Sequence, residues 1–451
     1  MKPSRPSRRP KLVTTLVETF GFSPWVATIV ALFLILLAAA AILWVYFSAP
    51  PREIAIISGP PGSTSQRYAE SYRQELAKHG IVLKIVPSGG SLDNLQRLSQ
   101  PGSGLDLGFV QGGLIGDNPP PPGLVSLGSV AYQPLWVFTR GTDRLELLSQ
   151  LAGRRVGIGA DGSGVQALAR ALLEANGITG APTTFVEQPS EAAANDFLAG
   201  KLDALFLMGD SAPTKLLGTL LRAPEVQVYN FTQADAFVRR LAKLNLNKVV
   251  LPEGAIDLAH NLPGSDLTLV GPAVELIARR GLNSAISDLV LKVAQQVHGK
   301  PGLFAKRGEF PAALEREFPL SDDALRYYKS GQAITYKLVE SFWVANLLNR
   351  LLVAIVPVLL ILIPAIRFLP VAYRWSVQLR IYRCYRPLLR LERDAGATVT
   401  AEHAAALLER LNAIEQEVNA LRVPASFASQ FYDLRNHLAF VRQRLESVVP
   451  A

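Results

Sequence analysis

The chain has 451 residues, of which 49% are hydrophobic and 18% charged, whereas roughly a quarter of the residues are charged in a typical soluble protein. One cysteine, Cys384, excludes an intrachain disulfide and a cysteine-based metal cluster, and the five histidines show no metal-ligand spacing. We therefore expect no metal and no cofactor. At roughly 150 residues per domain, the length allows two or three units with their own cores.

The net charge of +9 lies outside the centre of the chain. Residues 1–24 hold five basic residues and one acidic residue, and residues 367–451 hold twelve arginines and eight acidic residues. The long region at 48–349 is balanced, with 28 residues of each sign. Positive charge beside apolar runs is typical of membrane topology, so we expect no nucleic-acid partner.

The first apolar run, residues 25–47, contains no charged residue. As a helix it would be roughly 34 Å long, which is enough to cross a bilayer. A cleaved signal peptide is the alternative, but its apolar region is shorter and ends in small residues. Here the run ends in Trp44, Val45, Tyr46 and Phe47, which favours an uncleaved signal anchor with residues 1–24 in the cytoplasm.

Between residues 51 and 335, short β-rich runs alternate with helical stretches. This alternation predicts an α/β fold with largely parallel sheets, and the length fits two lobes. Ligands of such sheets bind beyond the carboxyl ends of the strands. Three Gly/Ser-rich turns stand at such positions, at 58–65, 87–91 and 159–164.

We interpret these turns as candidate solute contacts, because free backbone N–H groups and hydroxyls at a helix N-terminus favour anionic groups. Taken singly, each turn is more typical of a helix cap. Arg140, at the end of a predicted strand, is a candidate carboxylate clamp. The other candidate ligand-binding residues are Ser63, Thr64, Ser65, Ser88, Gly90, Ser91, Asn94, Gln111, Gly162, Ser163 and Gly164.

Signatures of catalysis are missing from the sequence. It contains no P-loop and no G-x-S-x-G nucleophile elbow, since Ser163 has Asp161 and Val165 where the elbow needs glycines. We therefore predict a protein that is not an enzyme.

A second apolar run at 342–366 predicts a second membrane span if Arg350 snorkels or pairs, with kinks at Pro357 and Pro364. A buried helix of a globular domain is the alternative. The arginines that follow this run favour the span, and they place both termini in the cytoplasm and the large domain outside. The expected location is a bacterial inner membrane, with the large domain in the periplasm.

The tail, residues 367–451, begins with a basic stretch that predicts a helix lying along anionic lipid headgroups. Apolar residues then recur with 4-3 spacing in two arms on either side of Pro424. This heptad pattern predicts an antiparallel helical hairpin, either self-contained or pairing with a partner as a coiled coil.

Six short segments between residues 53 and 331 form an ordered series along the chain. They are SGGSLDNL at 88–95, LDLGFVQ at 105–111, LAGRRVGIG at 151–159, GSG at 162–164, GKLDA at 200–204 and ALRYY at 324–328. In this order they resemble the TAXI-type solute-binding proteins of TRAP (tripartite ATP-independent periplasmic) transporters, which are class II periplasmic binding proteins. Thr64 and Ser65 stand where the family has two tyrosines, and Gly112-Gly113 stands where it often has a Ser-Asp pair.

The resemblance implies a two-lobed periplasmic binding protein fold, placed here between two transmembrane helices and followed by the helical tail. It also implies capture of a small organic, carboxylate-bearing or amino-acid-like solute in an interlobe cleft, with a TRAP permease as partner. The alternative is a ligand-sensing or scaffold protein that signals to a cytoplasmic protein through its tail.

Overall fold

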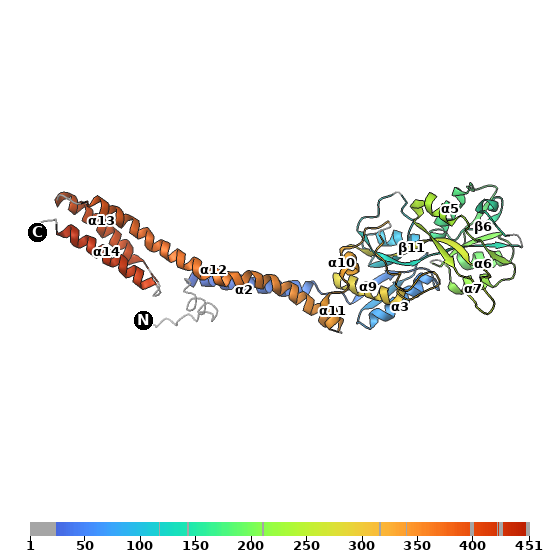
Figure 1. Ribbon diagram of the computed structural model, residues 1–451, viewed down its shortest axis with the longest axis horizontal. Coiled ribbons are helices and arrows are strands. Elements are labelled where there is room, and N and C mark those ends of the chain that lie inside the picture. The colour runs from blue at the N-terminus through green and yellow to red at the C-terminus, as the bar shows by residue number, and fades with distance from the viewer. Residues whose placement is uncertain are drawn as a thin grey trace, which may run out of the picture. The chain divides into compact units, whose positions relative to one another are not determined.

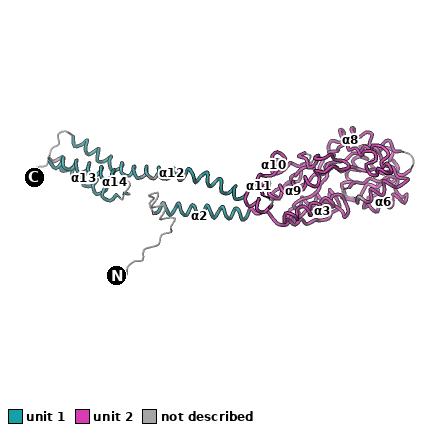
Figure 2. The backbone as a smooth tube through the Cα atoms, turned by 60° about the horizontal axis from the view of Figure 1, so that its bottom comes forward, with its two compact units in different colours: residues 1–47, 350–451 teal, residues 48–349 magenta. Residues whose placement is uncertain are grey.

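The computed structural model describes residues 24–116, 118–141, 144–209, 212–314, 317–339, 341–396, 401–421, 423 and 427–447. The chain divides into two compact units, residues 48–349 and residues 1–47 with 350–451 (Figure 2).

The first lobe of unit 48–349 is built on a parallel sheet in the order β2-β1-β3, a part of the chain coloured blue to cyan in Figure 1. Its strands are β1 (Glu53–Ile57), β2 (Val82–Val86) and β3 (Leu107–Gln111), connected by helices α3 (Thr64–Ala77) and α4 (Ser91–Ser99). The long strand β11 (Leu267–Arg279) lies antiparallel to β3. Alternating strands and helices with apolar inner faces favour this arrangement.

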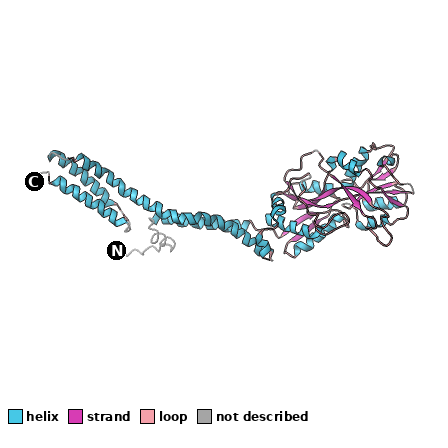
Figure 3. Ribbon diagram, viewed as in Figure 1, coloured by secondary structure: helices cyan, strands magenta, loops and turns pink. Residues whose placement is uncertain are grey.

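The second lobe repeats the order, with β7-β6-β8 followed by an antiparallel strand, β5. Its strands are β5 (Leu135–Arg140), β6 (Arg155–Gly157), β7 (Thr184–Val186), β8 (Ala204–Met208) and β9 (Val226–Val228), and its helices are α5 (Gly164–Ala175), α6 (Ser190–Leu198), α7 (Thr214–Leu221) and α8 (Ala234–Arg240). Figure 3 shows the mixture of strands and helices in unit 48–349. The α/β class with two lobes, predicted from the sequence, is confirmed.

Two chain segments cross between the lobes side by side. In β11, Leu269 and Val270 belong to the core of the second lobe, whereas Val274 and Leu276 belong to that of the first. The other crossing leads from β4 (Leu124–Tyr132), which pairs with β11, to β5, and Gln133 N donates to Pro272 O over 2.9 Å. Strand β10 (Leu246–Leu251) pairs with the second-lobe end of β11.

Helices α9 (Ser284–His298), α10 (Asp322–Ser330) and α11 (Ile334–Leu338) complete the first lobe. The first turn of the next helix, α12 (Phe342–Asp394), packs there as well. Phe342 is buried in the first-lobe core, and Trp343 Nε1 donates to His79 O over 3.0 Å. The first exposed large apolar residue of α12 is therefore Val344, and such residues become almost continuous from Leu347.

In the other unit, α2 (Pro24–Phe47) and the portion of α12 from Leu351 to Ile363 carry almost continuous apolar surface. Two described helices, at Ala27–Phe47 and Phe342–Pro364, are long and apolar enough to cross a membrane. Arg350 Nη1 donates to Val45 O over 2.5 Å, so this cation meets a C-terminal carbonyl of α2. Helix α12 runs through Pro357 and Pro364 without interruption.

The tail contains the expected pair of helices and one further packing partner. Helices α13 (Ala401–Ala420) and α14 (Ala428–Glu446) pack together, and the end of α12 contributes to the same core through Val377, Ile381, Cys384, Leu388 and Leu391. The basic stretch is thus the last part of α12, and it joins the two helices in a three-helix cluster. Arginines on α12 leave one apolar face free to pack, which explains the third helix.

Candidate functional site

The first Gly/Ser turn touches the second lobe directly. Ser63 caps α3, its Oγ accepting from Gln66 N over 3.2 Å, and Thr64 N donates to Gly209 O over 2.8 Å. Ser63 also forms an isolated β-bridge with Pro213. The turn that the sequence assigns to solute therefore binds backbone of the loop after β8.

A second contact joins the lobes at the end of β3. Gln111 is buried, and its Nε2 donates to Gly164 O over 3.1 Å. A β-carbon on Gly164 would collide with the Gln111 amide, so the close approach requires glycine. We call these two contacts, Thr64 N to Gly209 O and Gln111 Nε2 to Gly164 O, the lobe latch.

The remaining turns use their polar groups locally. Ser163 caps α5, its Oγ accepting from Gln166 N over 3.3 Å, and donates to Ala160 O over 2.6 Å. Gly162 N donates to Gln166 Oε1, and Ser65 is buried within α3. The cap interpretation thus holds for Ser63 and Ser163.

Asn94 forms its side-chain hydrogen bonds within the first lobe. Its Nδ2 donates to Ser58 O over 2.6 Å and to Phe109 O over 2.8 Å, and its Oδ1 accepts from Ser88 Oγ over 2.5 Å. Ser91 is buried at the first position of α4, and Gly90 precedes it with φ 130°. Asn94 thus ties the turn to Ser58, the residue after β1, and to Phe109 in β3.

Arg140 lies apart from the other predicted residues. Because β5 runs antiparallel to β8, its end lies at the edge where β6 and β8 begin, opposite the turns. There Arg140 Nη1 donates to Leu198 O over 2.9 Å, and Nη2 pairs with Glu225 over 3.1 Å. This placement overturns the expectation that Arg140 clamps a carboxylate in the cleft.

A cavity of about 440 Å³ lies where the two crossings meet, lined by residues of both lobes. Of the sequence-predicted residues, Thr64 lines it. Gln133 and Pro134 come from one crossing, and Gly209 follows β8. The principal further lining residues are Arg67, Tyr68, Tyr132, Trp136, Leu217, Leu221, His298, Lys300, Phe304 and Phe310.

The charged residues that line this cavity are all basic. Arg67 and Lys300 line it, whereas its described lining contains no Asp or Glu. Neither cation forms an ion pair with any described residue, and Arg67 Nη2 makes a long contact of 3.5 Å with Thr64 Oγ1. A cavity with two cations and an aromatic wall suits an anionic group attached to an apolar body.

His298 closes one side of the cavity among aromatic rings. Its ring lies 4.5 Å from that of Tyr68 and 5.7 Å from that of Tyr72, measured between centroids. Burial lowers the pKa of His298 to about 3, so the imidazole is neutral at physiological pH. Its Nε2 has no hydrogen-bond partner within the described residues. The positive charge of the site therefore comes from Arg67 and Lys300.

Sequence reasoning missed most of these lining residues. Arg67 and Tyr68 follow Thr64 at helical spacings of three and four, so that periodicity could have found them. Lys300 and Phe304 lie in an irregular segment after α9, where no pattern indicates long-range contacts. No group of three or more His, Cys, Asp or Glu side chains in the described part of the chain could hold a metal ion.

No family model and no curated protein matches the chain. Among solved structures, it is similar to the periplasmic aliphatic sulphonate binding protein SsuA from Escherichia coli, with 16% identity, coverage of 66% of this chain and 84% of that one, and a TM-score of 0.34. It is also similar to the alkanesulfonate-binding protein SsuA from Xanthomonas axonopodis pv. citri (17%, 65% and 95%, TM-score 0.34). An ancestral arginine-binding protein bound to glutamine is similar too (13%, 55% and 93%, TM-score 0.35). At these TM-scores the likenesses carry no argument about ligand.

Proposed function

We propose that the protein is a membrane-anchored solute-binding protein that takes a small organic anion into the cavity between its lobes. The observation that carries this proposal is the cavity of about 440 Å³, lined by Arg67 and Lys300 and by no described carboxylate. Its volume falls in the range of small-molecule sites, and its apolar walls would hold the body of the solute. The proposed contacts are Thr64, Arg67 and Lys300.

Membrane anchoring is supported by the exposed apolar side chains of α2 and α12. Exposed fractions include 61% for Phe33, 69% for Leu360 and 67% for Ile361. Continuous apolar surface of this extent along two long helices is unfavourable in water. A bilayer would cover this surface. With arginines following the second helix and basic residues preceding the first, both termini would be cytoplasmic and unit 48–349 periplasmic.

The finer assignment is a TAXI-type component of a TRAP transport system, delivering its solute to a permease. It is supported by the ordered motifs between residues 53 and 331. Two anchors also suit a second role, ligand sensing with output through the tail. One observation favours it: helix α12 contributes Phe342 to the first-lobe core and Leu388 to the three-helix cluster.

The test is a solute screen on the purified full chain in detergent, with melting temperature as the readout. The panel contains carboxylates, sulfonates and amino acids. A solute at a hundred times its Kd adds about 2.7 kcal/mol to the free energy of unfolding, which gives a measurable upward shift. A folded protein that no member of the panel stabilises would contradict solute binding. Capture of a cytoplasmic protein that depends on residues 401–447 would then favour the signalling role.

A further inference from the structure

A second hollow lies on the first lobe between α9, α10 and the segment 299–311, next to the solute cavity, with which it shares Phe310. Its volume is about 690 Å³. Lys292, Arg307 and Lys337 line it, and its described lining contains no Asp or Glu. We call it the basic hollow.

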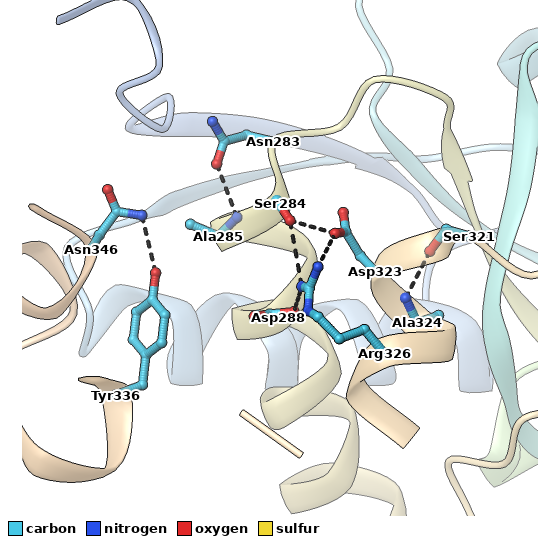
Figure 4. Close-up of polar contacts among 10 residues, drawn as sticks. All are labelled: Asn283, Ser284, Ala285, Asp288, Ser321, Asp323, Ala324, Arg326, Tyr336 and Asn346. Carbon is cyan, nitrogen blue, oxygen red and sulfur yellow. Dashed lines mark hydrogen bonds and ion pairs between the residues drawn. The ribbon is translucent and has the colours of Figure 1, made fainter. Parts of the chain in front are cut away.

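The three cations of the basic hollow are uncompensated. None of them forms an ion pair within the part of the chain that the structure describes. On α9 and α10, Asp288 and Asp323 bind Arg326 over 2.6 and 2.8 Å, as Figure 4 shows. Glu309, two residues after Arg307, accepts hydrogen bonds from Tyr132 OH over 2.9 Å and from Lys306 N over 2.7 Å. Three like charges around one hollow repel one another, so an anion placed there is favoured.

The walls of the basic hollow add hydrogen-bonding groups held in place. Gln295, Gln296 and Gln332 contribute amides, and Tyr327 OH donates to Gln295 Oε1 over 3.3 Å. Tyr328 OH donates to Leu127 O over 3.0 Å, which fixes the adjacent ring. Cationic and amide donors around an open hollow suit the oxygens of a phosphate group.

The basic hollow is also close to the second apolar helix along the chain. Lys337 lies five residues before Phe342, so the two Cα atoms are at most about 18 Å apart. On the same short helix as Lys337, Ile334 and Leu338 are 72% and 78% exposed. Exposed apolar residues beside a cation are typical of a helix at a membrane surface.

We propose that the basic hollow binds the phosphate-bearing headgroup of an anionic lipid. This inference rests on the proposed membrane anchoring, which would bring the first lobe to the bilayer surface. Lys292, Arg307 and Lys337 contact the phosphate, and Ile334 and Leu338 face the acyl region. The bound headgroup would hold the first lobe on the membrane while the second lobe remains able to move.

The test compares retention of phosphatidylglycerol and phosphatidylcholine by the purified full chain in detergent, using native mass spectrometry. The variant is Lys292→Gln/Arg307→Gln/Lys337→Gln. Its matched control is Lys215→Gln/Arg239→Gln/Arg240→Gln, three exposed basic residues of the second lobe. We expect the wild type and the control to prefer phosphatidylglycerol at least about tenfold and the variant to lose that preference. Lipids held by the apolar helices are common to all three proteins and cancel.

Inorganic phosphate at millimolar concentration distinguishes the two sources of a phosphate group. We expect it to leave bound phosphatidylglycerol in place. If phosphate displaces the lipid and binds wild type but not the variant, the ligand is free phosphate and the lipid assignment is wrong. Equal retention by variant and wild type overturns the site altogether.

Should the triple variant fail to fold, Lys292→Gln and Lys337→Gln are measured singly, each with an expected loss of about threefold in the preference for phosphatidylglycerol. Solute binding, measured on the same samples, is expected to be unchanged, so the two proposals fail separately.

Discussion

At the scale of single residues, neighbouring positions in one turn take different roles. Ser63 caps α3 and is fully buried, whereas Thr64, the next residue, lines the solute cavity. One helical turn later, Arg67 brings a guanidinium to the same cavity. The residues that face the solute cavity are therefore Thr64 and Arg67 of α3, whereas the Ser63 hydroxyl caps the helix.

Replacing Arg67 tests this division. Arg67→Gln removes the cation but keeps a side chain of similar polarity, and because the residue is exposed we expect a loss of affinity for an anionic solute of about tenfold. Isothermal titration calorimetry with the best solute of the screen measures the change. Arg73→Gln, on the same helix and paired with Glu70, is the control and should bind as wild type does. Equal affinity of both variants would remove Arg67 from the site.

Asp288 predicts a pH dependence of stability. Burial raises its pKa to about 6, against the opposing effect of Arg326 (Figure 4). A carboxyl whose pKa is higher in the folded than in the unfolded state favours folding while it is protonated. This contribution is present below about pH 4 and is lost as the pH rises through 6.

We therefore expect the wild-type free energy of unfolding to fall, relative to that of Asp288→Asn, by at most about 3 kcal/mol between pH 4 and 6.5. Urea unfolding at several pH values measures this difference. Asp322→Asn, an exposed neighbour on α10, is the control and should keep the wild-type slope. Parallel pH profiles for wild type and Asp288→Asn would show that Asp288 does not titrate in this range.

At the scale of elements, the lobe latch depends on the fit between the end of β3 and the start of α5. Gly164 has no room for a β-carbon against Gln111. Gly209 is similarly restricted, since a β-carbon there would lie 2.7 Å from Thr64 Oγ1. Small residues at both contacts allow the lobes to meet through backbone atoms.

The pair Gly164 and Gln111 gives a double-mutant test of the latch. Gly164→Ala places a methyl group on the buried amide, and we expect destabilisation of about 1–3 kcal/mol. Gln111→Ala/Gly164→Ala removes the obstacle, so part of that loss should return. Thermal unfolding of the wild type, the two single variants and the double variant gives the coupling energy. Purely additive effects would mean that the two residues do not meet.

At the scale of the whole molecule, the proposed topology predicts which surfaces labels can reach. In a Cys384→Ser background, Ser330→Cys, on the first lobe, should react with a membrane-impermeant maleimide in intact cells once the outer membrane is opened. Ser447→Cys, in the tail, should react only after the inner membrane is permeabilised. Both serines are exposed, so access to their side of the membrane decides the result. Labelling of both in intact cells would refute cytoplasmic placement of the tail.

The sequence predicts elements well where one pattern persists, and poorly where distant segments meet. The uninterrupted apolar run at 25–47 corresponds to α2 at Pro24–Phe47. Strand β11 continues through Gly271 and Pro272 to Arg279, although these two residue types often end a strand, because here they mark the crossing between the lobes. Lys300 and Phe304 reach the cavity from an irregular segment, a tertiary contact that no local spacing encodes. The packing of the basic helix against α13 and α14 was likewise not predicted, because its arginines indicated a lipid surface.

The lobe latch also has a kinetic consequence. Because the protein's own backbone and Gln111 hold the lobes together, a solute entering between them must wait for a spontaneous opening. Its apparent affinity is then the intrinsic affinity multiplied by the fraction of molecules that are open. Association would level off at high solute concentration at the opening rate, instead of rising without limit. A variant with a weaker latch, such as Gln111→Ala, would load its solute faster.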